Sequence, residues 1–419
     1  MEVREARAEY LAKPAYKQTE VGEIPEDWDV STVGGEFEVR LGKMLDAEKN
    51  VGVSKPFLGN RAVQWGRIDV SDLGEIRLSP DDLQRYRLRE GDLLVCEGGE
   101  VGRAAIWQQP LGECYYQKAL HRLRPKRGYN VTFMLNLLQR YSQSGVLQNY
   151  VTQTSIAHLP KDKFEALPIP VPPTLSEQQA IADALGDADA LIESLEHLLA
   201  KKRQIKQGTM QALLTGQQRL PGFDGAWVQT TLGQTATIQR GASPRPIDDP
   251  IWFDENSAVG WVRISDVTKA GIYLTETSQR LSENGVQHSR PVAAGSLIMS
   301  ICATVGLPVI TRLDTCIHDG FVVFDKLAAE QRFLYYSLKF IEGNWSRHGQ
   351  TGSQMNLNTG LINATAIEIP ATHEEQTAIA TVLTDMDAEI AALDAKLAKA
   401  RALKQGMMQT LLTGRIRLV

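Results

Sequence analysis

Apolar positions in the middle of the chain follow the spacing of a long helix. Between Ser176 and Gly216 they alternate in steps of four and three, at Ile181, Leu185, Ala188, Ile192, Leu195 and Leu199. This spacing is typical of a coiled-coil seam, which requires a partner helix. Ser176 with Gln179 predicts a capping box at the start, and Gly216 is a usual C-terminal stop. About 39 helical residues span roughly 58 Å, longer than a small domain is wide.

The partner helix is predicted in the same chain, because the pattern recurs in residues 372–414 after a capping box at Thr372 and Glu375. The second seam consists of Ile379, Leu383, Met386, Ile390, Leu393 and Leu397. Aligned without a gap, Glu177–Leu220 and Glu375–Leu418 are identical at 26 of 44 positions. This indicates an internal duplication. We expect the two helices to pair antiparallel, related by a pseudo-twofold axis.

The second half of each predicted helix departs from the apolar seam. Both copies contain the sequence Lys-Gln-Gly, and a glycine inside a helix costs about 1 kcal/mol against alanine. A solvated charged face explains the lysines but not the repeated glycines, whereas close approach of another protein explains both. We therefore predict partner docking by Lys206, Gln207, Gly208, Lys404, Gln405 and Gly406.

A strand-rich block precedes each long helix. Short alternating runs separated by Gly, Pro, Asn and Asp, with one helical patch each at 132–141 and 328–341, predict small α+β domains with largely antiparallel sheets. The blocks correspond through Trp28 with Trp227 and Gly42 with Gly241, and more loosely through residues 65–68 with 261–264 and Cys114 with Cys316. The predicted division is an N-terminal arm at 1–22, a first block at 23–172, a helix at 173–217, a second block at 218–371 and a helix at 372–419.

Composition bounds the class of protein. The chain of 419 residues is 43% hydrophobic and 23% charged, with a net charge of −5, as in ordinary globular proteins. It has no apolar run of 18 residues, and its first residues are charged, so we expect no membrane span or signal peptide. The four cysteines lack C-x-x-C spacing. They predict reduced thiols in a cytoplasmic protein, without a metal or disulfide framework.

Motifs for catalysis are missing from the sequence. Gly42-Lys43 lacks the rest of a P-loop, and the run Gly98–Gly102 is better explained as a strand turn than as a phosphate loop. The seven histidines make no metal-ligand spacing, and no Ser/His/Asp set stands out. We therefore expect a binding protein that is not an enzyme and needs no cofactor of its own.

Polar and basic residues in both blocks are candidates for contacts with duplex DNA, since two similar blocks on a rigid rod suit a ligand with two recognition elements. Arginine, lysine, amide and hydroxyl side chains contact base edges and phosphates. Solvated turns and structural ion pairs are the alternative explanation. The candidates are Arg40, Arg67, Lys118, Arg122, Gln153, Thr154, Ser155, His158, Arg240, Arg263, Gln350, Thr351, Ser353, Gln354 and Asn356.

The repeated pattern EQQAIA followed by KQG-x-MQ-x-LLTG, each copy after a variable block, resembles the specificity subunit of Type I restriction-modification systems over essentially the whole chain. The resemblance implies that each block is a target recognition domain for one half of a bipartite double-stranded DNA site. It implies that the helices set the spacer and dock two modification subunits. Those subunits bind S-adenosylmethionine and methylate adenine, while restriction subunits use ATP and Mg²⁺. A scaffold that holds two protein partners without DNA is the alternative, and a free-standing nuclease or methyltransferase is a third, weakened by the missing motifs.

Overall fold

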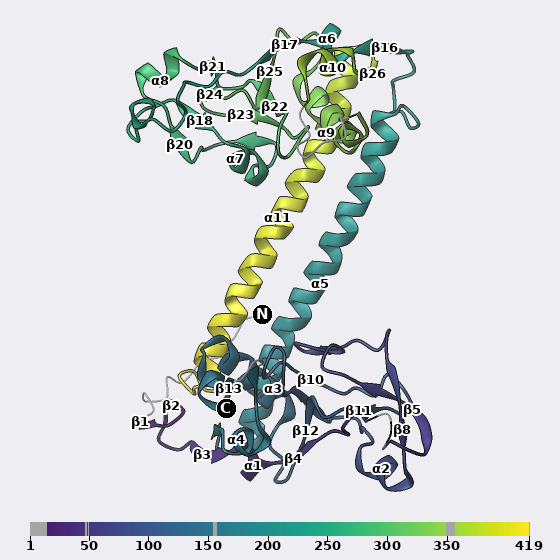
Figure 1. The fold of residues 1–419 in the computed structure, drawn as a ribbon, viewed down its shortest axis with the longest axis vertical. Helices are drawn as coiled ribbons and strands as arrows, with labels where there is room; N and C mark the ends of the chain where they lie inside the picture. The colour runs from purple at the N-terminus through teal and green to yellow at the C-terminus, as the bar shows by residue number, and fades with distance from the viewer. Residues whose placement is uncertain (1–14, 47, 49, 154–156, 349–356, 419) are drawn as a thin grey trace, which may run out of the picture. The chain divides into compact units, whose positions relative to one another are not determined.

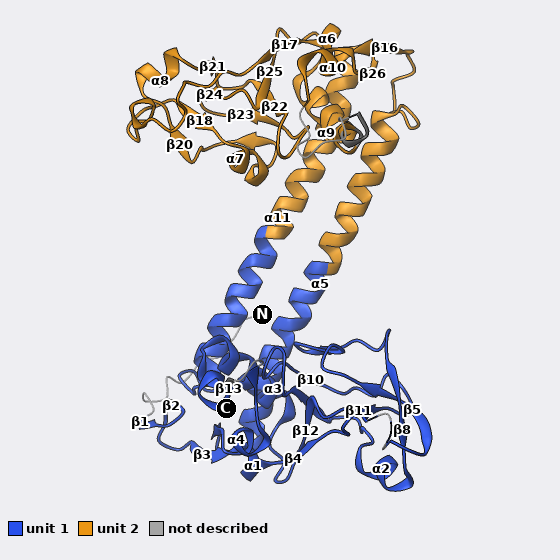
Figure 2. Cartoon of the chain, viewed as in Figure 1, with its two compact units in different colours: residues 1–196, 395–419 blue, residues 197–394 orange. Residues whose placement is uncertain are grey.

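The chain folds into two compact units in the computed structural model, which describes residues 15–46, 48, 50–153, 157–348 and 357–418 (Figure 1). Unit 1 comprises residues 1–196 and 395–419, and unit 2 comprises residues 197–394 (Figure 2). Each unit contains one strand-rich block and part of both long helices. Each unit therefore includes part of both predicted helical segments, 173–217 and 372–419. The division of the chain into five domains stays a prediction.

Corresponding elements recur in the two blocks. The first block contains β1 Tyr16–Thr19, β2 Gly22–Pro25, β3 Asp29–Thr32, α1 Val33–Glu36, β4 Phe37–Leu41, β5 Val53–Leu58, β6 Val63–Gln64, β7 Arg67–Ile68, β8 Gly74–Leu78, α2 Pro80–Arg85, β9 Leu93–Cys96, β10 Ala104–Ile106, β11 Tyr115–Tyr116, β12 Leu120–Pro125, α3 Val131–Gln143, η1 Val146–Tyr150, β13 Thr152–Gln153, β14 Ala157–His158, α4 Lys161–Glu165 and β15 Pro168–Val171. The second contains β16 Trp227–Thr231, α6 Leu232–Thr235, β17 Thr237–Arg240, η2 Pro250–Trp252, β18 Gly260–Val262, α7 Ile264–Lys269, β19 Tyr273–Leu274, β20 Gln279–Arg280, α8 Glu283–Gln287, β21 Arg290–Val292, β22 Leu297–Ser300, β23 Pro308–Thr311, β24 Thr315–Ile317, β25 Phe321–Asp325, α9 Gln331–His348, α10 Thr359–Ala364 and β26 Ala366–Pro370. The long helices are α5 Leu175–Leu214 and α11 His373–Leu411.

The main sheets of the two blocks share four strands in one order, and unit 2 adds β19, which pairs parallel with β23. The strand order β4-β12-β9-β10 in unit 1 corresponds to β17-β25-β22-β23 in unit 2, and all of these neighbours pair antiparallel. A second sheet contains one parallel pair in each unit, β5 with β11 and β18 with β24. The α+β class with largely antiparallel sheets is confirmed.

Both long helices contribute to the core of each unit. In unit 1, buried side chains of α3 and the main sheet pack against Ile181 and Leu185 of α5 and against Leu411 near the end of α11. In unit 2, the matching residues are Ile379 and Leu383 of α11, together with Leu213 and Leu214 of α5. The apolar seam predicted from the sequence therefore continues into a globular core at both ends of each helix, which fixes the helix against its block.

Ion pairs along the helices show that they run antiparallel. In unit 1, Arg417 pairs with Glu177, Lys404 with Asp189 and Arg401 with Glu196. The residue numbers on the C-terminal segment fall as those on α5 rise, which is the order of antiparallel helices. Unit 2 repeats all three pairs at the duplicated positions, as Arg219 with Glu375, Lys206 with Asp387 and Arg203 with Asp394. The predicted antiparallel pairing and the internal duplication are confirmed.

The predicted start of the first long helix is wrong by two residues. Thr174, not Ser176, accepts the hydrogen bond from the backbone N–H of Glu177, at 3.1 Å. Its equivalent Thr372 does the same for Glu375, at 3.4 Å, as the sequence predicted for the second helix. Both stops are as predicted, since Gly216 and Gly414 have a φ of +66°, which favours glycine.

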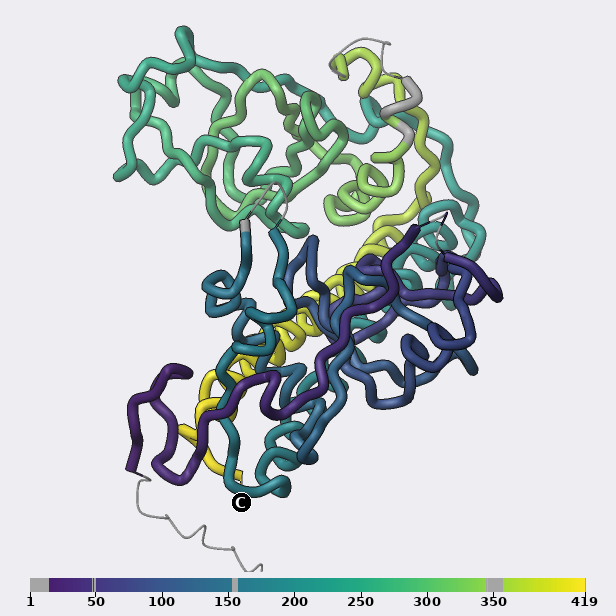
Figure 3. Tube along the Cα trace, turned by 60° about the horizontal axis from the view of Figure 1, so that its bottom comes forward, coloured from purple at the N-terminus to yellow at the C-terminus, as the bar shows by residue number. Residues whose placement is uncertain are grey.

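The two ends of the described chain meet in unit 1. The Tyr16 hydroxyl lies 3.4 Å from the backbone oxygen of Arg415, and the Arg417 guanidinium donates to both oxygens of Asp27 at 2.9 and 3.0 Å. Figure 3 shows the purple N-terminal strands beside the yellow end of the chain. The segment after α11 is therefore bound to the beginning of the first block.

Candidate nucleic-acid interface

Several turns of unit 1 gather at one edge of its main sheet. We call this set the unit 1 loop group, consisting of residues 42–44, 59–61, 98–102 and 117–119 with His158. The backbone N–H of Lys118 donates to the oxygen of Lys43 at 2.8 Å, and the N–H of Gln117 donates to Leu58 at 3.0 Å. Gly98 forms a β-bridge with His158. Because these contacts tie each turn to the next, the polar side chains share one surface.

The corresponding turns gather in unit 2. We call them the unit 2 loop group, consisting of residues 241–245, 302–306 and 318–320 with Arg263. The backbone N–H of Ala242 donates to Ile317 at 3.1 Å, and the N–H of Ile301 donates to Gly320 at 2.8 Å. Arg240 directly precedes the first of these turns, and its Nε donates to the backbone oxygen of Asp319 at 2.7 Å.

Paired glycines explain why the two loop groups are built alike. A Cβ added at Gly42 would lie 2.3 Å from the backbone oxygen of Gln117, and one at Gly241 would lie 2.1 Å from that of His318. No side chain fits so close to a carbonyl, so both positions require glycine. Gly42 and Gly241 correspond as predicted, and their contacts also make Gln117 equivalent to His318 and Lys118 equivalent to Asp319.

Strand register corrects two other correspondences inferred from the sequence and also aligns the arginines near the paired glycines. Leu41 and Arg240 both directly precede the paired glycine, so Arg40 corresponds to Gln239 and not to Arg240. Trp261 lies in β18 and pairs with β24, whereas Trp65 lies in the turn between β6 and β7. Residues 65–68 and 261–264 are therefore not equivalent, and neither are Arg67 and Arg263. Cys316 corresponds to Tyr115, one residue after Cys114.

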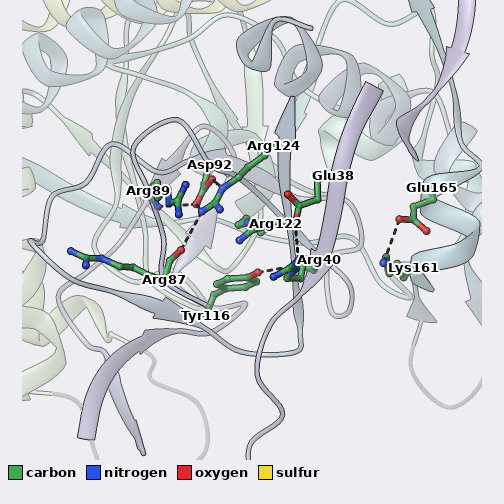
Figure 4. Close-up of polar contacts among 10 residues, drawn as sticks. All are labelled: Glu38, Arg40, Arg87, Arg89, Asp92, Tyr116, Arg122, Arg124, Lys161 and Glu165. Atoms are coloured by element: carbon green, nitrogen blue, oxygen red, sulfur yellow. Dashed lines mark hydrogen bonds and ion pairs between the residues drawn. The ribbon is translucent and has the colours of Figure 1, made fainter. Parts of the chain in front are cut away.

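Arg122 is buried in unit 1, and Figure 4 shows it together with Arg40 and Glu38. Its side chain is 2% exposed, and its Nη2 lies 2.9 Å from Oε1 of Glu38 on the neighbouring strand. Arg40 shares that carboxylate at 3.1 Å and is partly exposed. Because the guanidinium is buried, losing Glu38 would leave its charge uncompensated, so the contact between Arg122 and Glu38 supports the sheet. The geometry does not present it to a ligand.

Lys118 and His158 are exposed in the unit 1 loop group. Burial raises the pKa of the neighbouring Glu97 carboxyl, and the charges of Lys118 and His158 oppose that shift. Arg67 is exposed on β7, outside the group. The two exposed basic side chains of the loop group therefore both lie in the neighbourhood of Glu97.

The other predicted residues have the following positions. Arg240 is exposed, and Arg263 is half-buried and lines an open pocket of about 550 Å³ with Asp254 and Arg280. The backbone of Gln153 belongs to β13. Outside the described residues lie Thr154, Ser155, Gln350, Thr351, Ser353, Gln354 and Asn356.

Three polar residues of the unit 2 loop group, Ser243, Arg245 and Asp319, were not among the candidates predicted from the sequence. Ser243 and Arg245 both contact the carboxylate of Asp319, at 2.7 and 3.1 Å. The available signal was the run Ser-Pro-Arg-Pro, which begins two residues after the paired Gly241. Nothing in the sequence indicates its partner Asp319, which lies 76 positions from Ser243.

The seam lysines have a structural role that the sequence did not reveal. Lys404 is buried and its Nζ lies 2.6 Å from Asp189, and Lys206 is paired with Asp387. Carboxylates on the facing helix therefore compensate the charge of both lysines within the coil. The rest of the predicted docking segments is exposed on the helix surface, namely Gln207, Gly208, Gln405 and Gly406.

Exposed apolar side chains form a stripe on α5. Leu191, Leu198 and Ile205 are spaced by seven residues, so they lie on one face of this continuous helix. Leu403 of α11 is also exposed and is the duplicate of Ile205. The positions on α11 that duplicate Leu191 and Leu198 are the charged Glu389 and Lys396. The stripe therefore distinguishes the two otherwise similar helices.

Among the residues that the structure describes, no three His, Cys, Asp or Glu side chains are grouped so as to hold a metal ion. No helix within the described ranges is both long and apolar enough to cross a membrane.

Comparison with known proteins places the chain in a family. The family model of the Type I restriction modification DNA specificity domain matches residues 25–207 and 225–400. The chain is 24% identical to a putative type I restriction enzyme MjaX specificity subunit of Methanocaldococcus jannaschii, covering 98% of each chain. It is also 24% identical to the MjaVIII specificity subunit of that organism, covering 98% of this chain and 97% of the relative.

Solved structures share the fold. The S subunit of a Type I restriction-modification system from M. genitalium matches with a TM-score of 0.60 at 14% identity, covering 92% of this chain and 96% of that one. A chain from a study of complex assembly and conformational transition of the type I R-M system matches with a TM-score of 0.59 at 18% identity, covering 94% and 99%. Two matches to the family model, at the two duplicated halves, carry the assignment: the chain belongs to the family of Type I restriction-modification specificity subunits.

Proposed function

We propose that each unit reads one half of a bipartite double-stranded DNA site. The observation that carries the proposal is the repetition of one loop group in each unit, built on the same glycine contact but lined by different side chains. Equivalent frames with different surfaces suit two half-sites of different sequence. Mapping methylated adenines in cells that hold this chain with its modification subunit tests this function.

The chemistry is proposed to reside in other subunits. The chain supplies recognition and is not itself an enzyme, and S-adenosylmethionine, ATP and Mg²⁺ are bound by modification and restriction subunits. The complex acts in the cytoplasm. The sequence supports this division because it lacks a phosphate loop, a metal-ligand spacing and a nucleophile set.

The long helices are proposed to set the spacer and to dock two modification subunits. Support comes from the surface that remains after the ion pairs are formed. Gln207 and Gly208 stay exposed although the neighbouring lysine is bound, and a Cβ added at Gly208 would meet nothing within 4 Å. The stripe of Leu191, Leu198 and Ile205 adds apolar surface that a helix of a partner can cover.

Replacing both docking glycines by alanine is expected to stabilise the isolated chain and weaken its assembly with the modification subunit. Each Gly→Ala change gains about 1 kcal/mol of helix propensity, because Gly208 and Gly406 face open space in the chain. In a packed interface the added methyl group costs about 1–3 kcal/mol, so affinity should fall about tenfold or more. Thermal unfolding and a titration of the two subunits measure these effects.

Gly186 provides the matched control for this experiment. It lies in α5 outside the Lys-Gln-Gly segments, and a Cβ there also meets nothing within 4 Å. Gly186→Ala should stabilise the helix equally and leave assembly unchanged. If G208A and G406A assemble with the affinity of the parent chain, these glycines are not part of the docking surface.

A further inference from the structure

An exposed arginine in the unit 2 loop group is held by a fixed carboxylate. The Arg245 side chain is 70% exposed, and its Nη2 lies 3.1 Å from Oδ2 of Asp319. Only one terminal nitrogen takes part in this contact, so most of the donor edge of the guanidinium faces solvent. The side chain is thus oriented and accessible at the same time.

Asp319 is itself fixed from several sides. The Ser243 hydroxyl donates to its Oδ1 at 2.7 Å, and Arg240 Nε donates to its backbone oxygen at 2.7 Å. The neighbouring His318 accepts a hydrogen bond from the Gly320 N–H at 2.9 Å, which closes the turn. The hydrogen bond from Ser243 holds the pKa of the Asp319 carboxyl below its ordinary value, and the Arg245 charge adds to this effect. The carboxylate is therefore ionised at neutral pH and stays in place.

This arrangement favours a base over a phosphate as the ligand of Arg245. The planar guanidinium matches the O6 and N7 acceptors of guanine in the major groove with two hydrogen bonds. The Asp319 carboxylate offsets the charge of Arg245, which weakens attraction to phosphate but leaves the donors intact. A side chain that is already oriented also loses less entropy on binding.

The unit 1 loop group lacks this device. Lys118 stands at the position of Asp319, and Met44 stands at the position of Ser243 with its side chain exposed. Lys43, which precedes Met44, is bound to Asp82 at 2.8 Å. A lysine and an exposed methionine offer a point charge and an apolar contact, whereas unit 2 offers a planar guanidinium held by a carboxylate. The two units therefore present different recognition chemistry at equivalent places.

We propose that Arg245 reads a guanine in the half-site bound by unit 2, with Asp319 as the positioning residue that aims its guanidinium. The inference rests on the proposed function and specifies one contact within it. It assigns at least one G·C pair to that half-site.

The test is to map methylated sites for variants of the full chain assembled with its modification subunit. Arg245→Ala should make one G·C position of the unit 2 half-site degenerate and weaken binding to the parent site about tenfold to a hundredfold. Arg245→Lys should also lose the preference, because an ammonium cannot form the fork. Asp319→Asn keeps an acceptor for Ser243 but removes the charge, so it should relax the same position to a smaller degree.

Two internal controls accompany these variants. The half-site read by unit 1 should stay unchanged in all of them, and so should the thermal stability of the chain. Arg312→Ala removes another exposed arginine of unit 2, one that stacks on Tyr273 at 3.8 Å, and should leave the motif unchanged.

Three results would overturn the inference. One is an unchanged motif for Arg245→Ala, another is equal weakening of all sequences, which identifies a phosphate contact, and the third is a unit 2 half-site without a G·C pair. In each case the parent chain still directs methylation to a bipartite site, so the proposed function stands. Absence of any site that depends on the parent chain would instead remove the proposed function.

Discussion

Seven residues added to each long helix are expected to lengthen the unread spacer of the DNA site by about three base pairs. One heptad extends a helix by about 10 Å and keeps the seam in phase. The insertions belong after Leu198 and after its duplicate Lys396. The ion pair of Glu196 with Arg401 then stays within unit 1, and that of Arg203 with Asp394 stays within unit 2.

The longer site should also be bound more weakly than the original. Three base pairs rotate the groove by about 100°, and the added coil supplies only part of that rotation. A chain with one insertion alone is the matched control, because it shifts the register of the ion pairs and should fail to assemble correctly. A double insertion that methylates the original spacer unchanged would show that these helices do not set the distance.

Glu177→Ala is expected to destabilise unit 1 by about 3 kcal/mol, because it breaks a buried ion pair. Glu177 is 1% exposed and accepts hydrogen bonds from Nε and Nη2 of Arg417, the second at 2.9 Å. Arg417 keeps its contacts with Asp27 in this variant. The loss of stability should therefore lie at the lower end of the range for broken buried ion pairs. Hydrogen exchange of α3 amides during urea unfolding reports on unit 1 alone.

The exposed pair of Glu196 with Arg401 is the control for that measurement. It joins the same two helices in the same unit, but both side chains are exposed to solvent. Glu196→Ala should therefore cost less than about 1 kcal/mol. Equal losses for the two variants would mean that burial does not set the strength of these pairs.

The long helices could be predicted from the sequence because their signal is local and repeated. The heptad spacing identifies the seam, and the duplication supplies the partner. The cap was misplaced because Thr174 and Ser176 are both good capping residues, and the choice depends on where the preceding prolines direct the chain. The ion pairs of the seam lysines could not be predicted, because their carboxylate partners belong to the other helix.

The candidate interface was less predictable, since side-chain environment depends on contacts between distant segments. Arg122 lies in a basic run, yet its guanidinium is buried and pairs with Glu38 on the adjacent strand. Arg40 and Arg240 both lie near a paired glycine, but a difference of one residue along a strand places them on opposite faces. Arg245 was overlooked because Asp319, which orients it, is distant in the sequence.

Sequencing methylated adenines in DNA from cells that carry this chain with its modification subunit tests directly whether the chain reads a bipartite site. We expect two short specified runs separated by a spacer of constant length and unspecified sequence, methylated only when this chain is present. Exchanging the second block for that of another family member should change one run and leave the other. A single contiguous motif, or methylation that does not depend on this chain, would contradict the account and favour a scaffold that does not read DNA.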